Sequence, residues 1–138
     1  MKIEIIDFGA AERGHLPKRI HANDCGADVF APYKWSLRPG DTIKLPLGFG
    51  IKIPAGYGGF IYPRGSMAKN GINCALNPID PSYIGEIHAT LTNCGRKALT
   101  FEAGDRIGQL VILPCTIADF VPEPLEERGD NGFGSTGK

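Results

Sequence analysis

Short hydrophobic runs, each bounded by glycine or proline, dominate the chain. Alternating or β-branched runs predict strands at residues 2–8, 42–45, 50–53, 59–62, 84–92, 98–101 and 106–113. The longest interval free of both glycine and proline, residues 86–94, is too short for a long helix. One helical turn is expected at residues 66–70, with Ser66 as its N-cap. The pattern predicts an all-β fold, either a sandwich, a jelly roll or a distorted barrel.

Length and charge narrow the class of protein. The chain has 138 residues, which predicts one domain, over residues 1–121. Pro122, Pro124 and a charged run then predict a mobile C-terminal arm over residues 122–138. The 15 basic and 15 acidic residues balance, so broad electrostatic attachment to nucleic acid or to a membrane surface is not indicated.

Cysteine and histidine spacing points to no metal centre and no disulfide framework. The four cysteines contain no Cys-x-x-Cys pair, and acidic residues interrupt the N-terminal run where a signal peptide would be apolar. We therefore expect free thiols and a cytoplasmic protein. The histidines lack metal-ligand spacing, and no run approaches the length of a membrane span.

Residues 128–138 have the composition of a phosphate-binding segment, but so glycine-rich a terminal segment is not expected to form a stable fold by itself. Glycines allow close backbone approach to an anion, and hydroxyls and cationic side chains add donors. Phe133 offers an aromatic ring that can stack on a base. This composition indicates a lid that closes over a nucleotide bound elsewhere. An ordinary glycine-rich terminus is the alternative.

Two turns in the body offer charged groups. Asp28 precedes an apolar pair and is expected to open a strand with its carboxylate at the rim. It is either a turn aspartate or a carboxylate that holds a hydrated divalent ion. Arg64, Gly65 and Ser66 follow a predicted strand at the start of the helical turn. Free N–H groups beside an arginine and a hydroxyl favour an anion there, although a plain capped turn explains the same residues.

Two further segments contain candidate site residues. Asp80 lies between Pro78 and Pro81, which stiffen the backbone. Asp80 is either a general base held by this rigid backbone or an ordinary residue of a β-turn. Tyr83 either packs against a sugar or fills the core. Gln109 is unusual on a buried strand unless its amide has a partner, whereas the preceding Asp105 and Arg106 are interpreted as a turn and a structural ion pair.

In this order, these segments resemble the all-β homotrimeric deoxyuridine triphosphate nucleotidohydrolase (dUTPase) family, from about Gly26 to Lys138. The motifs that carry the resemblance are Pro63-Arg64 with Met67-Ala68-Lys69, Ile79-Asp80 with Tyr83 and Gly85, Gly104-Asp105-Arg106-Ile107 with Gln109, and Arg128-Gly129 with Gly132-Phe133-Gly134-Ser135-Thr136-Gly137.

The resemblance implies a jelly-roll-like subunit, a homotrimer with composite sites, and hydrolysis of dUTP to dUMP and pyrophosphate. Water attacks the α-phosphorus in line with the help of Mg²⁺, which limits uracil incorporation into DNA and supplies dUMP for thymidylate synthesis. One subunit contributes the uracil hairpin at residues 75–83. A second contributes the Arg64 turn with Gln109, and a third contributes its C-terminal arm.

The same resemblance implies a role for each residue. Asp80 is the expected base, Asp28 orders the hydrated Mg²⁺ through water, and Tyr83 excludes a ribose 2′-hydroxyl. Most Mg²⁺ ligands would come from phosphates and water. Phe133 is expected to stack on uracil. The other substrate-binding residues are expected to be Arg64, Gly65, Ser66, Asn77, Ile79, Gln109, Arg128, Gly134, Ser135 and Thr136.

The chain departs from the family pattern at three places. Asn131 stands where the tail motif has glycine, a mild change because asparagine tolerates left-handed backbone conformations. Gly65 stands where the family has a serine beside the α,β-bridging oxygen, so either Ser66 reaches that place or another donor serves. Pro78 removes a backbone donor from the uracil hairpin, so other groups, with Asn77 among them, must read the base.

Two other functions compete with dUTP hydrolysis. The dCTP deaminases share the fold, but they place a catalytic glutamate where this chain has Thr90, which argues against deamination. A nucleotide-gated regulatory binding protein is favoured by the altered turn at Gly65. Such regulators often carry an inserted segment, for which a chain of 138 residues has no room.

Overall fold

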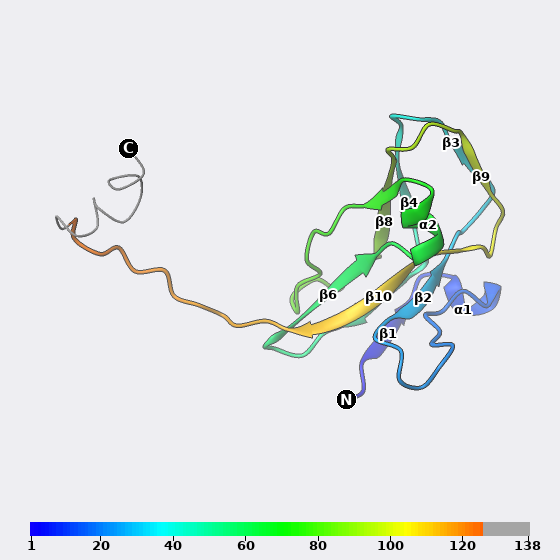
Figure 1. The fold of residues 1–138 in the computed structure, drawn as a ribbon. Helices are drawn as coiled ribbons and strands as arrows, with labels where there is room; N and C mark the ends of the chain where they lie inside the picture. The colour runs from blue at the N-terminus through cyan, green and yellow to red at the C-terminus, as the bar shows by residue number, and fades with distance from the viewer. Residues whose placement is uncertain (126–138) are drawn as a thin grey trace, which may run out of the picture.

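The computed structural model describes residues 1–125, and this part of the chain is nearly all β (Figure 1). Two single-turn helices accompany the strands, α1 (Ala10–Arg13) and α2 (Gly65–Lys69). The strands are β1 (Glu4–Asp7), β2 (Ala27–Phe30), β3 (Trp35–Leu37), β4 (Thr42–Pro46), β5 (Phe49–Lys52), β6 (Tyr57–Tyr62), β7 (Ile72–Cys74), β8 (His88–Asn93), β9 (Leu99–Phe101) and β10 (Arg106–Pro114). The predictions for Arg128, Phe133, Gly134, Ser135 and Thr136 lie outside the described residues.

The strands form small antiparallel sheets, ordered β1-β5, β2-β10-β6, β3-β9 and β4-β8-β7. All of these pairs except β7-β8 join strands distant in sequence, as expected for a jelly-roll-like fold rather than a meander. The predicted all-β, jelly-roll-like fold is confirmed. In the three-stranded sheet around β10, Gln109 pairs with Asp28 on β2 and with Tyr62 on β6. This register sets Gln109 between Asp28 and the turn that follows β6.

All seven predicted strands are present, with two local corrections. Residues 84–87 were predicted as strand but are not, because the chain turns at Tyr83, whose N–H donates to the carbonyl of Asp80. The helical turn begins one residue earlier than predicted, and its N-cap is Arg64 rather than Ser66. Arg64 has extended backbone angles, and its carbonyl accepts the first helical hydrogen bond, from Ala68.

Strands β3 and β7 and helix α1 were not among the predicted elements, whereas the strand expected to open at Asp28 is present as β2. Three or four residues give too short a pattern to recognise, and long-range pairing decides such segments. Trp35 on β3 shows this, because its ring stacks on Phe101 of β9 with centroids 4.3 Å apart.

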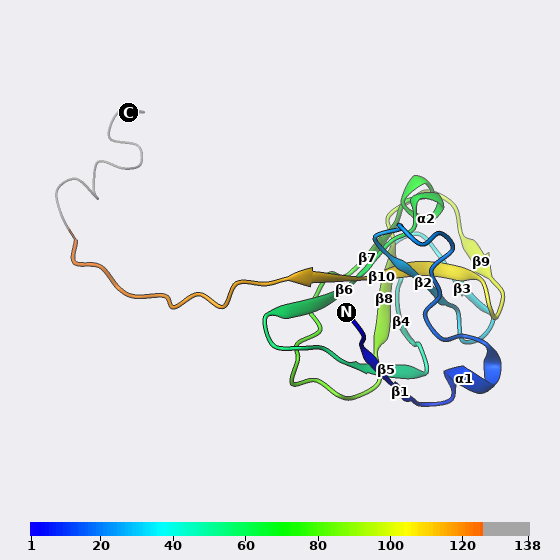
Figure 2. The ribbon, with the colours of Figure 1, turned by 90° about the horizontal axis from the view of Figure 1, so that it is seen from below.

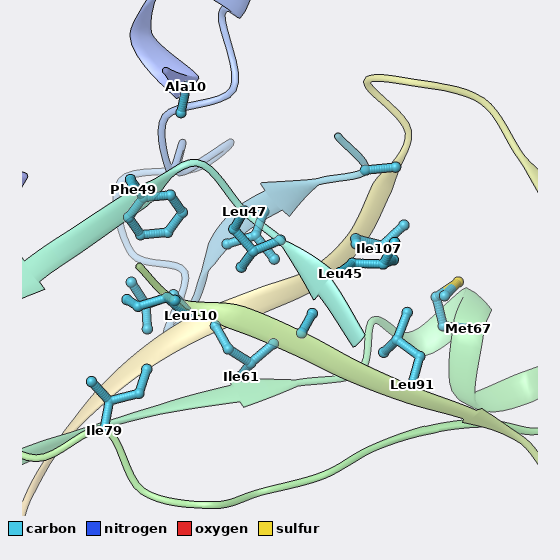
Figure 3. Close-up of a cluster of buried hydrophobic side chains, with 14 of the residues drawn as sticks. Ala10, Leu45, Leu47, Phe49, Ile61, Met67, Ile79, Leu91, Ile107 and Leu110 are labelled. Atoms are coloured by element: carbon cyan, nitrogen blue, oxygen red, sulfur yellow. The ribbon is translucent and has the colours of Figure 1, made fainter. Parts of the chain in front are cut away.

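A single apolar core lies between the sheets (Figure 3). Alternate residues of β8 point inward, so that Ala89 and Leu91 are fully buried while His88 and Thr90 face outward. The largest fully buried side chains are Phe49, Leu45, Ile72, Leu91, Ile107 and Val29. The core thereby fixes which face of β8 remains available to a ligand.

Beyond β10 the described chain leaves the body, in both views of the ribbon (Figures 1 and 2). The Cys115 N–H donates to the carbonyl of Gly56, and residues 116–125 are all exposed. Large apolar side chains on this segment lie open to solvent, with Phe120 95% and Leu125 90% exposed.

The four cysteines are free thiols, and burial raises the pKa of Cys74 to about 11. Among residues 1–125, no helix combines the length and the apolar character needed to span a membrane.

Candidate active site

Asp28 lies at the centre of a charged cleft. Its side chain is only 13% exposed, and each of its carboxylate oxygens faces an arginine. Oδ1 lies 3.5 Å from Nε of Arg64, and Oδ2 lies 3.5 Å from Nη1 of Arg106. The backbone of Asp28 is held by reciprocal hydrogen bonds to Lys18. The carboxylate is therefore fixed between two cations rather than placed at a free turn.

Arg64 is oriented by Asp28. Because the ion pair uses Nε, the two terminal nitrogens of the guanidinium remain available for an anion. The side chain is 28% exposed, so it is partly withdrawn from water and still accessible. Arg64 follows β6 directly and caps α2, and both contacts restrict its backbone.

Gln109 has the amide partner that the sequence led us to expect. Its Nε2 donates to the carbonyl of Pro63 at 3.3 Å. A Cβ added to Gly26 would lie 2.5 Å from Oε1 of Gln109, so this glycine allows the amide to lie against the backbone of the Asp28 loop. Asp28, Arg64, Gly65 and Gln109 all line one cleft of about 400 Å³.

Gly65 and Ser66 face different surroundings. Gly65 lines the cleft of Asp28 and Gln109, and a Cβ built on it meets no atom within 4 Å. Ser66 lines a neighbouring hollow with Met67, Asn70 and Thr100. The described structure therefore places no serine hydroxyl at position 65 of the cleft and leaves open space for one.

A second cavity, of about 270 Å³, lies beneath the segment that precedes β8. The predicted site residues Asn77, Ile79, Asp80 and Tyr83 all line it. The cavity is close to the lower end of the volumes typical of small-molecule sites. Its floor is the outward face of two paired strands, and its other lining residues include Lys44, Glu86, His88 and Thr90.

Ile79 anchors the hairpin side of this cavity. Its backbone exchanges hydrogen bonds of 3.0 and 2.7 Å with Gly59 on β6, and its side chain is buried. A Cβ on Gly59 would lie 3.4 Å from the Ile79 side chain, so the two segments are in close contact. The residue that follows, Asp80, is thereby held at the rim of the cavity.

Asp80 and Glu86 are the two carboxylates of this cavity, and they differ in their contacts. Oε2 of Glu86 accepts the Gly48 N–H at 2.9 Å, so that carboxylate holds a neighbouring loop. Within residues 1–125, no hydrogen bond or ion pair engages the carboxylate of Asp80, which is exposed. Of the two, Asp80 is the one available to a water molecule.

Apart from Ser66, the predicted residues that the structure describes thus fall into two groups in one chain. The Asp28 cleft and the Asp80 cavity share no lining residue. Ile61 of β6 lines the cavity, and Arg64, in the turn that follows β6, lines the cleft. A ligand that contacts both groups must span this strand or be completed by another copy of the chain.

The residues of the Asp28 cleft fit a magnesium ion that arrives with its own ligands. Mg²⁺ keeps several waters and takes few protein oxygens. Asp28 supplies one carboxylate, and no group of three or more His, Cys, Asp or Glu in residues 1–125 is suited to hold a metal. Two arginines beside Asp28 oppose a bare cation, whereas a metal carried by phosphate groups would be compatible with them.

Sequence reasoning misplaced Arg106, which it paired with Asp105. The carboxylate of Asp105 instead accepts the Glu102 N–H at 2.8 Å, and Arg106 reaches Asp28. The antiparallel register of β2 and β10 brings them together, with a bulge between Arg106 and Gly108. Only the strand pairing, which the sequence does not reveal, could have identified this contact.

A protein-family model described as dUTPase matches residues 12–137, nearly the whole chain. The chain belongs to the dUTPase family. A deoxyuridine 5′-triphosphate nucleotidohydrolase of Leifsonia xyli is 40% identical over 129 residues, which cover 88% of this chain and 85% of the relative. The enzyme of the same name from Gloeobacter violaceus is 41% identical over 130 residues, which cover 88% of each chain.

Solved dUTPase structures share the fold. The protein described as native EIAV dUTPase has a TM-score of 0.74 at 26% identity, covering 91% of this chain and 98% of that one. A dUTPase of Staphylococcus bacteriophage 80alpha, solved with dUpNHpp, has a TM-score of 0.80 at 22% identity and covers 98% of both chains. The dUTPase of phage phi11, described with a structural Mg(II) ion, has a TM-score of 0.79 at 19% identity, covering 92% of this chain and 98% of that one.

Proposed function

We propose that this chain hydrolyses dUTP to dUMP and pyrophosphate, with Asp80 as the base that orients and deprotonates water. Family membership, and the name shared by relatives about 40% identical, support the reaction. The free carboxylate of Asp80 above a cavity of ligand size supports its role. Removal of dUTP would limit uracil incorporation into DNA, and the dUMP released would supply thymidylate synthesis.

On the base side, the Asp80 cavity holds the deoxyuridine. Asn77 and Ile79 lie against the base, and Tyr83 closes the sugar side. Pro78 offers no N–H, so side chains on the cavity wall take part in reading the base. Asp80, at the rim, accepts a proton from the water that attacks the α-phosphorus.

On the phosphate side, the Asp28 cleft binds the triphosphate. The terminal nitrogens of Arg64 and the Gln109 amide face phosphate oxygens, and Arg106 adds positive charge. Fixed donors of this kind stabilise charge on the transferred phosphoryl group, which is the main requirement of the reaction. Asp28 keeps the cations in place.

Magnesium would enter with the triphosphate and neutralise its charge. Asp28 would hold it through water, and phosphates and waters would supply the other ligands. The arginines on either side of Asp28 then face the phosphates rather than the ion. The protein would act in the cytoplasm, which its four free thiols favour.

A homotrimer reconciles the two groups of residues. The Asp80 cavity of one subunit meets the Asp28 cleft of a second, and the C-terminal arm of a third covers the nucleotide. The exposed apolar side chains on residues 116–125 support an arm that packs against a neighbour. In the arm, Arg128, Ser135 and Thr136 would bind the outer phosphates, with Gly134 allowing close approach.

The test is pyrophosphate release from dUTP, dTTP, dCTP and UTP in the presence of Mg²⁺. We expect fast release from dUTP and little from the other three. Ammonia release from dCTP would indicate a deaminase instead. Binding of dUTP without release would favour a nucleotide-gated regulatory protein and contradict the proposal.

Restoring a hydroxyl at position 65 should increase activity. The open space beside Gly65 accepts a serine, and its hydroxyl would donate to a phosphate oxygen in the cleft. We expect Gly65→Ser to raise kcat/KM for dUTP about tenfold, because a hydrogen bond to a charged group is worth about 1.5–3 kcal/mol. Gly65→Ala is the matched control, since it adds the Cβ without the hydroxyl. Equal rates for the two variants would show that Ser66 or another group already serves.

Loss of the aromatic ring at Phe133 should weaken nucleotide binding. Stacking on a base contributes about 1–3 kcal/mol, so Phe133→Ala should raise the Kd for a non-hydrolysable dUTP analogue by about 5- to 150-fold. Calorimetric titration measures the change, with Phe133→Trp as the control that keeps a stacking surface. An unchanged Kd in Phe133→Ala would mean that the arm does not cover the base.

A further inference from the structure

Tyr83 lines the Asp80 cavity, yet the core does not hold it. Its side chain is 45% exposed, so apolar packing alone leaves the ring free to move. A residue that discriminates by occupying a defined volume must nevertheless be fixed. The contacts that fix it come from the residues that follow it in sequence.

One contact holds the end of the Tyr83 ring. Its hydroxyl donates to the carbonyl of Glu86 at 2.5 Å, while its own N–H donates to the carbonyl of Asp80 at 3.0 Å. The side chain therefore folds back over the turn that it belongs to. The ring crosses Gly85 in doing so.

Gly85 is the surface on which the ring lies. A Cβ on Gly85 would lie 2.7 Å from the Tyr83 hydroxyl oxygen, 2.8 Å from Cζ and 3.1 Å from Cε1. Real Cβ atoms do not approach other heavy atoms so closely, so the ring occupies the space that any side chain at position 85 would need. Gly85 does not have a positive φ, so this close contact, and not backbone strain, is what requires glycine there.

The backbone of Gly85 cannot retreat from the ring. Its carbonyl oxygen lies over Gly50 of β5, where a Cβ would approach it to 2.5 Å. The next residue but one, Ile87, donates its N–H to Phe49 and accepts from Leu47, which secures the chain against the sheet. An added methyl group at position 85 would consequently displace the end of the tyrosine side chain rather than the backbone.

We propose that Gly85 is a positioning residue for substrate selection. Because it has no side chain, the Tyr83 ring can pack against it while the Glu86 carbonyl accepts the tyrosine hydroxyl, and Tyr83 in this position rejects nucleotides with a 2′-hydroxyl. This inference rests on the proposed hydrolysis of dUTP. Gly85 does not touch the substrate and acts only through Tyr83. Gly50 supports Gly85 from below.

The test compares Gly85→Ala with the wild type on dUTP and UTP. We expect the ratio of kcat/KM for dUTP to kcat/KM for UTP to fall about tenfold or more, in the range that a steric difference of one small group supplies. The melting temperature should change little, because the end of a flexible side chain moves. A Gly85→Ala protein that does not fold would contradict this expectation and the positioning role of Gly85.

A second variant separates a positioning role from a general disturbance of the hairpin. In a Tyr83→Ala background, adding Gly85→Ala should change the ratio no further, because the residue that it positions is gone. An equal fall in both backgrounds would overturn the proposal. Tyr83→Phe, which loses only the hydroxyl, should lower the ratio by a smaller factor.

A direct readout does not depend on activity. Protein labelled with ¹³C in tyrosine rings gives signals from four tyrosines, and Tyr83→Phe identifies that of Tyr83. Gly85→Ala should shift this signal towards that of a solvated tyrosine. An unmoved signal together with an unchanged substrate ratio would contradict the positioning role of Gly85 and leave the proposed function unaffected. A wild type that releases no pyrophosphate from dUTP would instead contradict the proposed function.

Discussion

Asp80→Asn should abolish dUTP hydrolysis and leave binding intact. Asparagine keeps the shape of the side chain but cannot accept the proton of the attacking water, and general base catalysis contributes about 10²- to 10⁴-fold. The Kd for dUTP should be equal or lower, since one negative charge beside the triphosphate is removed. Steady-state pyrophosphate release gives the turnover number, and calorimetry on the same preparation gives the Kd.

Glu86→Gln is the matched control for that experiment. Glu86 lines the same cavity, but its carboxylate serves as an acceptor for the Gly48 N–H, which a glutamine oxygen can replace. We expect this variant to retain turnover. If Glu86→Gln lost activity and Asp80→Asn kept it, the assignment of the base would be wrong.

Removal of residues 128–138 should abolish activity without unfolding the body. The arm is proposed to supply phosphate donors and to exclude water from the site, and misplacement or loss of such groups costs about 10²-fold or more. Within residues 1–125, the core lies between the sheets and contains no residue beyond β10. The melting temperature of the shortened protein should therefore stay within about 2 °C of the full-length value.

Ligand-induced stabilisation provides the control for the truncation. A non-hydrolysable dUTP analogue should raise the melting temperature of the full-length protein much more than that of the shortened one, because the shortened protein binds more weakly. A large fall in melting temperature without any ligand would identify the arm as a structural element instead.

The sequence predicted the β framework because glycine and proline divide it into runs with clear alternation. Residues 106–113, for example, correspond closely to β10. It failed where pairing decides the structure. Trp35 lies on a strand of three residues that exists because β9 lies beside it, and such long-range contacts have no local signature.

The site residues divide along the same line. Asp80 between two prolines and the Arg64 turn were recognisable as local motifs, and the structure places both beside cavities. The contact between Arg106 and Asp28 was not, since it depends on the register of two strands far apart in sequence. Likewise, the sequence identified Gly85 only as part of a family motif. Its close contact with the Tyr83 ring is visible only in the structure.

The most direct test of the account mixes two inactive proteins. Asp80→Asn leaves the Asp28 cleft intact, and Arg64→Ala leaves the Asp80 cavity intact. If each site combines the cavity of one subunit with the cleft of another, each mixed trimer has one intact site, and protein from equal co-expression should show about a quarter of wild-type turnover overall. Activity no greater than that of the two separate proteins would contradict a shared site.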